Sequence, residues 1–304
     1  MCELPRKIII IAYTHQFQKP DILQTATQQY KLVKKIKDER FDEELIHQYH
    51  LLINIGTRDF QVLIIHPEEH RVLLLEDYVL PVVSSADELL ALLVQLFDAH
   101  ALLRAAFWKK IKISFKSQKF VQVPKALFAE DALVDYLKFN SPVDLQLEEV
   151  LLVDNPQADA VTVFAVNKNL LEWLYSTYAT NHPSLSHQSA ALIEGIMKVS
   201  ARRSDNPLYV YVDRFKLHIL SCSDGALLYY NQFVIKQFSD YIKYIMLVMQ
   251  SLGLNQETSN VLLWGYIGKN SPHYHEFYKY INNVSFGERP HHLQFNYLFD
   301  DIQD

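Results

Sequence analysis

The sequence predicts an α/β protein made of two similar domains, and three observations support this fold class. The same succession of segments occurs twice: three closely spaced apolar, β-branched runs, then a long amphipathic helix and another apolar run. The chain has 304 residues, a length that suits two domains of ordinary size. Its composition, 49% hydrophobic and 21% charged, is that of a globular protein. We therefore expect two mixed sheets, each with a three-strand meander flanked by helices.

The first copy begins near residue 41. Its apolar runs alternate with polar residues in the period of two that is typical of half-buried strands. They predict strands over residues 50–56, 60–66, 71–78 and 110–117, with a short edge piece at 121–124. Between the third and fourth strands, Ser85 is placed to cap a helix that starts at Ala86. Glu88 should complete a capping box by reaching back to the Ser85 backbone.

A middle section separates the two copies. Helical periodicity predicts helices over residues 129–139 and 168–180, and two apolar runs between them predict a hairpin over 149–155 and 160–167. Pro183 then breaks the chain. A third helix is expected to start at Ser186 and to end near residue 200.

The second copy repeats the pattern of the first. Strands are predicted over residues 208–213, 216–221, 226–235 and 261–268, with a last short strand at 284–286. A helix over 240–252 should end at Gly253, a residue type that favours the C-cap position. A further helix is expected to start with Ser271 as its N-cap and Pro272 as its first residue, and to end near residue 282.

The start of the chain differs in composition from the rest. A short apolar run, Ile8 to Tyr13, is followed by a polar stretch and then by the charged segment Lys31 to Arg40, which we interpret as a solvated helix or linker. The predicted organisation is therefore an N-terminal extension over residues 1–40, a first domain over 41–185 and a second over 186–304. The aromatic, acidic residues at the end of the chain are assigned to no element.

Charge and composition exclude several classes of protein. The net charge of −6 argues against a nucleic-acid partner, because nucleic-acid surfaces are recognised by basic patches. The two cysteines, Cys2 and Cys222, cannot build a disulfide framework or a zinc ribbon. The apolar run near the start is too short for a membrane span and lacks a signal-peptide cleavage site. We expect a soluble cytoplasmic protein.

The duplicated strand–strand–strand–helix–strand unit is the ground plan of actin-like, ribonuclease-H-like domains. Residues 41–78, 121–124 and 217–268 resemble an uncharacterised Bacteroidetes family, domain-of-unknown-function family 3822. The run LHILSCSDGALLYYNQF, which starts at Leu217, carries the most specific part of this resemblance. The resemblance implies an actin-like ATPase fold, similar to that of cytoplasmic pilus-assembly and type II secretion proteins. It implies an architecture and no activity.

In actin-like ATPases, the first hairpin carries Asp-x-Gly-Thr/Ser, whose amides cradle phosphates and whose carboxylate holds the water shell of magnesium. The matching residues here are Asn54, Ile55, Gly56 and Thr57. Gly56 and Thr57 are retained, although an ordinary hairpin turn uses the same residue types. Asn54 can accept a hydrogen bond but lacks the negative charge that attracts a hard cation.

The other two phosphate elements of the fold are incomplete. Asp213 stands where the second hairpin should carry Asp-x-Gly-Gly-Gly-Thr, but Arg214 and Phe215 follow it, and their side chains would block a close phosphate. The adenosine-binding turn is partly echoed by Gly265, Gly268 and Ser271. The helix after Ser271 offers free amides to an anion, although a strand followed by a capped helix explains the same residues.

We therefore predict a non-catalytic binding or scaffolding protein on an actin-like ATPase fold with degenerate phosphate loops. It would use no cofactor or metal and would engage an unknown protein partner through its cleft or an aromatic surface. The candidates for that surface are Tyr229, Tyr230, Phe233, Tyr241 and Tyr244. Most of them are expected to lie in the core, and those exposed together would form the binding patch.

Two alternatives stay open. The first is an atypical nucleotide-binding protein or weak ATPase that takes ATP with Mg. Its candidate site residues are Asn54, Gly56, Thr57, Asp213, Gly265, Gly268 and Ser271. The second is a two-metal nuclease of the ribonuclease-H type, for which only Asp59, Asp213 and Glu194 are available as carboxylates.

Overall fold

The computed structural model describes residues 30–287 except 70 and 269, so most of the predicted N-terminal extension and the end of the chain lie outside the described residues. The described chain divides into two compact units. Unit 1 comprises residues 30–121, 129–153 and 163–188, and unit 2 comprises residues 122–128, 154–162 and 189–287. The chain passes between the units several times between residues 121 and 189.

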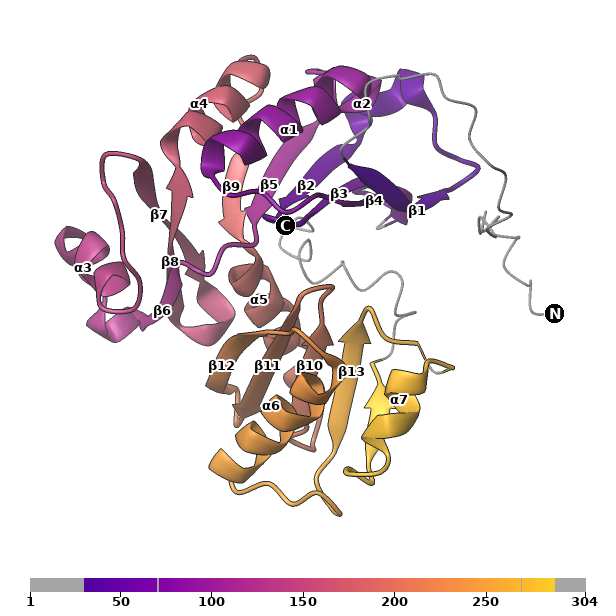
Figure 1. The fold of residues 1–304 in the computed structure, drawn as a ribbon, viewed down its shortest axis with the longest axis vertical. Coiled ribbons are helices and arrows are strands. Elements are labelled where there is room, and N and C mark those ends of the chain that lie inside the picture. The colour runs from indigo at the N-terminus through magenta and orange to yellow at the C-terminus, as the bar shows by residue number, and fades with distance from the viewer. Residues whose placement is uncertain (1–29, 70, 269, 288–304) are drawn as a thin grey trace. The chain divides into compact units, whose positions relative to one another are not determined.

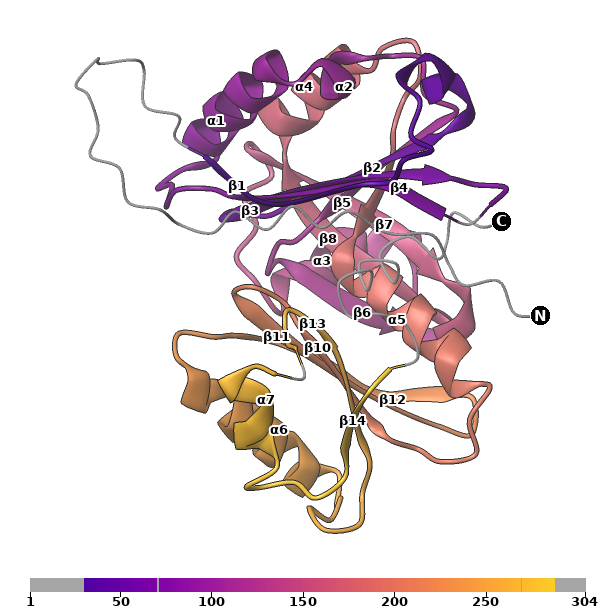
Figure 2. The ribbon, with the colours of Figure 1, turned by 90° about the vertical axis from the view of Figure 1, so that its right-hand side faces the viewer.

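Unit 1 contains a six-stranded sheet (Figures 1 and 2). In spatial order its strands are β1 (Lys31–Lys37), β4 (Arg71–Val79), β3 (Asp59–His66), β2 (His50–Ile55), β5 (Lys110–Phe115) and β9 (Ser184–His187). Strands β2, β3 and β4 form the predicted antiparallel meander, and β5 and β9 run parallel to β2 and β5. Every residue of β2 is buried, and the strand lies inside the sheet between β3 and β5.

Three helices cover one face of this sheet (Figure 2): α1 (Ala86–Ala99), α2 (Ala101–Arg104) and α4 (Lys168–Thr177). As predicted, α1 starts after Ser85, whose Oγ accepts the Glu88 amide at 3.1 Å. Glu88 does not reach the Ser85 backbone, because its carboxylate accepts the amide and the hydroxyl of Ser84, both at 2.7 Å. Helix α4 ends at Thr177, three residues before the predicted end.

Strand β1 corrects the interpretation of residues 31–40 as a charged helix or linker. Residues 31–37 pair antiparallel with β4 and form the edge of the sheet. Four of the seven residues are lysines, which is a common composition for an edge strand because the charges discourage pairing with another chain. The dense charge that suggested a solvated helix is therefore the signature of a protected sheet edge.

Glu76 on β4 is a buried carboxylate with three polar partners. Its oxygens lie 2.7 Å from Lys35 Nζ on β1, 2.6 Å from His100 Nε2 and 2.6 Å from Tyr78 Oη. Burial by itself would raise the pKa of Glu76, but the hydrogen bonds from His100, Lys35 and Tyr78 outweigh burial and lower the pKa from 4.5 to about 2. The folded protein therefore holds Glu76 ionised in acid.

This lowered pKa predicts a loss of stability in acid. Because the folded pKa lies below the unfolded one, the contribution of Glu76 is present above pH 4.5 and lost as the pH falls toward about 2. The lost free energy of unfolding should be on the order of 3 kcal/mol. Urea unfolding between pH 6 and 2 measures it. The Glu76→Gln variant should lack this pH dependence, whereas Glu68→Gln, which changes an exposed carboxylate, should retain it. An unchanged slope in Glu76→Gln would contradict the assignment.

Unit 2 contains a five-stranded sheet. In spatial order its strands are β12 (Ala226–Val234), β11 (Lys216–Ser223), β10 (Leu208–Val212), β13 (Val261–Gly265) and β14 (Val284–Phe286). Strands β10 to β12 form an antiparallel meander, and β13 and β14 run parallel to β10 and β13. The sheet thus has the same order and directions of strands as β4-β3-β2-β5-β9 in unit 1.

Alternation along β10 divides the core of unit 2 between the two faces of its sheet. Leu208 and Val210 pack with helices α6 (Phe238–Ser251) and α7 (Pro272–Phe277). Tyr209 and Tyr211 point to the opposite face and pack with α5 (Gln188–Ser200). Two predicted helix boundaries are wrong. Residues 186 and 187 belong to β9 rather than to a helix, and α7 ends at Phe277 rather than near residue 282.

The middle section forms a small three-stranded sheet in the order β6-β8-β7. Its strands are β6 (Phe120–Pro124), β8 (Ala160–Asn167) and β7 (Glu148–Asn155), so the predicted hairpin is confirmed. Helix α3 (Leu133–Lys138) is shorter than the helix predicted over residues 129–139. The structure also contains four short 3₁₀ helices within the described residues: Glu43–Gln48, Lys125–Leu127, Glu130–Ala132 and Pro156–Ala158. Among the described residues, no helix combines the length and apolar character needed to cross a bilayer.

Candidate functional site

The candidate phosphate turn of unit 1 connects β2 to β3. The Gly56 amide donates to the Asp59 carbonyl at 2.9 Å, which closes the turn, and the Lys116 amide donates to the Ile55 carbonyl at 2.8 Å. Thr57 lies within the turn. The structure therefore places Asn54, Gly56 and Thr57 in one strand–turn–strand segment, as the sequence predicted.

Asn54 takes part in a buried chain of side-chain hydrogen bonds across the meander. Its Nδ2 donates to Gln61 Oε1 on β3 at 3.0 Å, and Gln61 Nε2 donates to Asp77 Oδ1 on β4 at 3.3 Å. All three residues are fully buried. Asn54 therefore links β2 to β3, and Gln61 extends the chain to β4. An ionised Asp at residue 54 could not donate the first of these hydrogen bonds.

A buried ion pair lies beside the turn. Lys116 Nζ donates to Asp59 Oδ2, and the two side chains are only 2% and 6% exposed. The other carboxylate oxygen, Asp59 Oδ1, lies so close to Gly56 that a Cβ at residue 56 would overlap it. The space that glycine leaves open at this turn is thus filled by a carboxylate of the protein itself. Sequence reasoning missed Lys116, because a lysine just after a strand carries no distinctive signal.

The corresponding turn of unit 2 connects β10 to β11. The Asp213 amide donates to the Lys216 carbonyl at 2.9 Å, and Asp213 Oδ1 accepts the Arg214 amide at 2.8 Å. Among the described residues, positive φ outside glycine occurs at Asp159 and Asp224 alone, so Arg214 and Phe215 form this turn without a glycine conformation. The Arg214 guanidinium lies 4.7 Å from the ring centre of Tyr266, a cation–π distance.

The third candidate element joins β13 to α7. Gly265 has a φ of +94°, and the Tyr266 amide that follows it donates to the Val212 carbonyl at 2.7 Å. Ser271 Oγ accepts the Tyr274 amide at 3.1 Å, so Ser271 is the predicted N-cap, and its own amide donates to the Gly268 carbonyl at 2.9 Å. Helix α7 has six residues, too few for the strong dipole that an anion site needs.

Asp213 belongs to a buried polar group in unit 2. His218 Nε2 lies 3.9 Å from Asp213 Oδ2, and His218 Nδ1 lies 2.9 Å from Tyr230 Oη. Tyr230 also hydrogen-bonds Ser189 of α5. Burial raises the pKa of Tyr230, the Asp213 charge raises it further, and the Ser189 hydrogen bond opposes both. Period two along β11 and β12 is the sequence signal that could have placed His218 and Tyr230 on the face toward α5.

The carboxylates proposed for a nuclease belong to different units: Asp59 lies in unit 1, and Asp213 and Glu194 lie in unit 2. Glu194 of α5 accepts the Gln157 amide at 3.2 and 3.3 Å and so caps a loop. Asp59 pairs with Lys116, and Asp213 Oδ2 lies 3.9 Å from His218 Nε2. Within residues 30–287, apart from the two gaps, no group of three or more His, Cys, Asp or Glu side chains is arranged to hold a metal ion.

The aromatic residues considered as candidates for a binding surface are half-buried. Four of them pack on the core beneath α6 and α7, and Tyr230 packs on the α5 side. Phe233 and Tyr244 stack with ring centres 4.5 Å apart. These residues therefore strengthen the core of unit 2, as expected for most of them.

The chain has the fold of a known class, the proteins with an actin-like ATPase fold. The chain is similar to a protein from Bacteroides thetaiotaomicron VPI-5482 that is described as having this fold and unknown function. The TM-score is 0.74 at 24% identity, over 85% of this chain and 98% of that one. A chain of a PilM–PilN type IV pilus biogenesis complex is similar with a TM-score of 0.52 at 11% identity, over 78% and 88% of the two chains.

The chain belongs to the family described as "Protein of unknown function (DUF3822)", whose model matches residues 38–284. This confirms the family resemblance and, with the structural likeness, the actin-like ATPase fold. No curated protein matches the chain.

Proposed function

We propose that this chain is a non-catalytic binding or scaffolding protein that has an actin-like ATPase fold with degenerate phosphate loops and uses no nucleotide or metal. Its two units would be duplicated actin-like domains, since their sheets share one strand order and one set of directions. The observation that carries the proposal is the Asp59 carboxylate, which fills the space beside Gly56 and is ion-paired with Lys116.

The electrostatics of this turn disfavour a phosphate. A phosphate beside Gly56 would have to displace or lie against a carboxylate of the same charge. It would also compete with that carboxylate for Lys116, the nearby buried cation. Separating a buried ion pair leaves an uncompensated charge, which costs several kcal/mol. At the first loop, the Asp59 carboxylate therefore already takes the position and the cation that a phosphate would need.

The second loop supports the same proposal by a different route. Phosphate loops bring backbone amides close to the ligand, which requires residues without side chains. In unit 2 the turn consists of Arg214 and Phe215, and the Arg214 amide is already bonded to Asp213. A protein partner is proposed instead of a nucleotide, and the occurrence of this fold in the PilM–PilN complex supports a role in protein assembly.

Nucleotide titrations test the proposal. We expect no saturable heat in calorimetry and no rise in melting temperature with Mg-ATP, Mg-ADP or Mg²⁺ alone, because a ligand stabilises only a protein whose native state binds it. The variant Asp59→Asn serves as a control, because it removes the negative charge that would repel a phosphate beside Gly56.

Nucleotide binding by the wild-type protein would contradict the proposal. Saturable binding by the wild-type protein that is lost in Thr57→Val or Asp213→Ala would establish the nucleotide-binding alternative and sink the proposal. Binding retained in both variants would place the nucleotide elsewhere and would also contradict a protein without nucleotide.

A further inference from the structure

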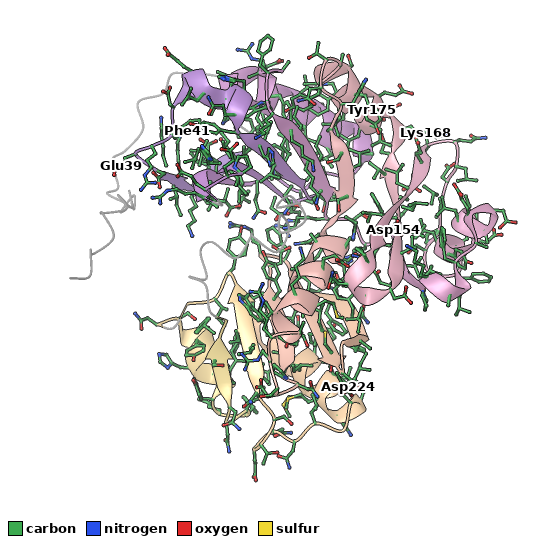
Figure 3. The ribbon with its side chains drawn as sticks, turned by 180° about the vertical axis from the view of Figure 1, so that it is seen from behind. Glu39, Phe41, Asp154, Lys168, Tyr175 and Asp224 are labelled. Carbon is green, nitrogen blue, oxygen red and sulfur yellow. The ribbon has the colours of Figure 1, made fainter. Side chains whose placement is uncertain are left out.

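Exposed apolar side chains occur in unit 1 where the turn before β7 meets helix α4. Leu145 and Leu147 of the turn are 43% and 57% exposed, and Tyr175 of α4 is 38% exposed. Lys168 joins the turn to the helix: its Nζ donates to the Leu145 carbonyl at 2.6 Å, and its amide donates to the Leu147 carbonyl at 2.9 Å. We call residues 144–149 and the exposed side of α4 the turn–helix face. Figure 3 labels Lys168 and Tyr175 on it.

The turn–helix face is acidic. Residues 144–149 and 168–177 together carry four carboxylates and one lysine. Glu148 is neutralised by Lys119 Nζ at 2.7 Å. Asp144, Glu149 and Glu172 are exposed and form no ion pair within the described part of the chain. The face therefore combines exposed apolar groups with unpaired negative charges.

Glu149 of β7 connects the acidic and the apolar parts of this face. Burial and the nearby charge of Glu149 raise the pKa of Tyr175. The carboxylate of β7 thus acts on the exposed ring of α4, although the two residues are 26 positions apart in sequence. A ligand that contacts the Tyr175 ring would also meet the negative charge.

These two properties indicate the class of partner. Nucleic acids and the cytoplasmic surfaces of membranes are anionic, so the unpaired carboxylates repel both. Two copies of the face across a two-fold axis would bring like charges together, which disfavours a homodimer. Apolar groups beside negative charges instead match a segment that carries apolar side chains next to lysine or arginine.

We propose that the turn–helix face binds a cationic amphipathic segment of a partner protein. Leu147 and Tyr175 contact the apolar side chains of that segment, and Glu149 and Glu172 contact its lysine or arginine side chains. The Tyr175 ring suits these cations as well, because the face of an aromatic ring attracts positive charge. The partner is the protein partner of the proposed function, on which this proposal rests.

Fluorescence anisotropy on the full chain tests the face with a labelled synthetic peptide. The probe is an amphipathic helix of leucine and lysine, and a comparison peptide has glutamate in place of every lysine. We expect saturable binding of the lysine peptide that weakens as salt rises, and much weaker binding of the glutamate peptide. Leu147→Lys should raise the dissociation constant by at least about tenfold, because it places a like charge in the apolar contact.

Matched variants in unit 2 serve as controls. Leu247 of α6 is 53% exposed, so Leu247→Lys makes the same change at a similar exposure and should leave binding intact. Glu149→Lys should weaken binding of the lysine peptide, whereas Glu257→Lys, which changes an exposed carboxylate of unit 2, should not. Circular dichroism melting confirms that each variant is folded.

Several outcomes overturn the proposal. These are no saturable binding of the lysine peptide, equal binding of the two peptides, or equal effects of Leu147→Lys and Leu247→Lys. Self-association of the chain that Leu147→Lys abolishes would assign the face to a second copy and would overturn the proposal too. The nucleotide titrations give a separate answer: a chain that binds no peptide can still lack a nucleotide site, and nucleotide binding would leave the peptide result unchanged.

Discussion

Replacing Lys116 by methionine is expected to lower the free energy of unfolding by about 3–5 kcal/mol, which is one of the two largest effects in this protein. The substitution removes the ammonium group that pairs with the buried Asp59 carboxylate, and the methionine side chain cannot replace it. Urea unfolding at neutral pH measures the loss.

Two comparisons isolate the ion pair as the cause. In Lys119→Met the same substitution breaks the pair with Glu148, whose lysine is 36% exposed, so the expected loss is within about 1 kcal/mol. The double variant Asp59→Asn/Lys116→Met should recover most of the stability, since it removes both charges of the pair. Equal losses in Lys116→Met and Lys119→Met would show that Asp59 and Lys116 are not a buried structural pair.

Replacing Gly265 by alanine should cost about 2–5 kcal/mol for two reasons that add. The φ of +94° is strained for any residue with a Cβ, and a Cβ at this position would overlap the Val212 backbone carbonyl on β10. That carbonyl also accepts the Tyr266 amide, so it cannot move away without breaking the hydrogen bond. Chemical denaturation measures the change.

Gly225→Ala is the matched control for Gly265. Gly225 has a similar φ of +76°, but a Cβ there meets open space. Its cost should therefore be the conformational part alone, about 1–2 kcal/mol. If the two substitutions cost the same, the close approach between β10 and β13 contributes nothing.

The meanders and most helices were predictable because their signals are local. Alternating apolar residues in β2 or β10 and the Ser85 cap of α1 act over a few residues, and the structure confirms them. The mixed α/β architecture also followed from the repeated pattern and the family resemblance. Errors fell where a local signal has two structural meanings. The lysines of β1 suit a solvated helix as well as an edge strand, and the pairing with β4 that decides between them is more than 35 residues away.

The candidate site was predictable in position but not in content. The turn at Asn54 to Thr57 lies where the repeat placed it. Its decisive group, the pair of Asp59 with Lys116, joins residues 57 positions apart and has no motif. The same holds for Tyr230, His218 and Ser189, which the sheet and α5 bring together in unit 2. Side-chain contacts between distant segments depend on the packing that only the structure reveals.

Strand β1 also determines how far the N-terminus of this protein can be truncated. The match to the family begins at residue 38, just after β1 ends at Lys37. A version of the chain trimmed to the matched range would keep every shared sequence feature but would strip β4 of its neighbour and Glu76 of the Lys35 ammonium. The family match starts at residue 38, whereas the hydrogen-bonded sheet starts at residue 31. A truncated protein therefore has to include β1 to keep the sheet intact.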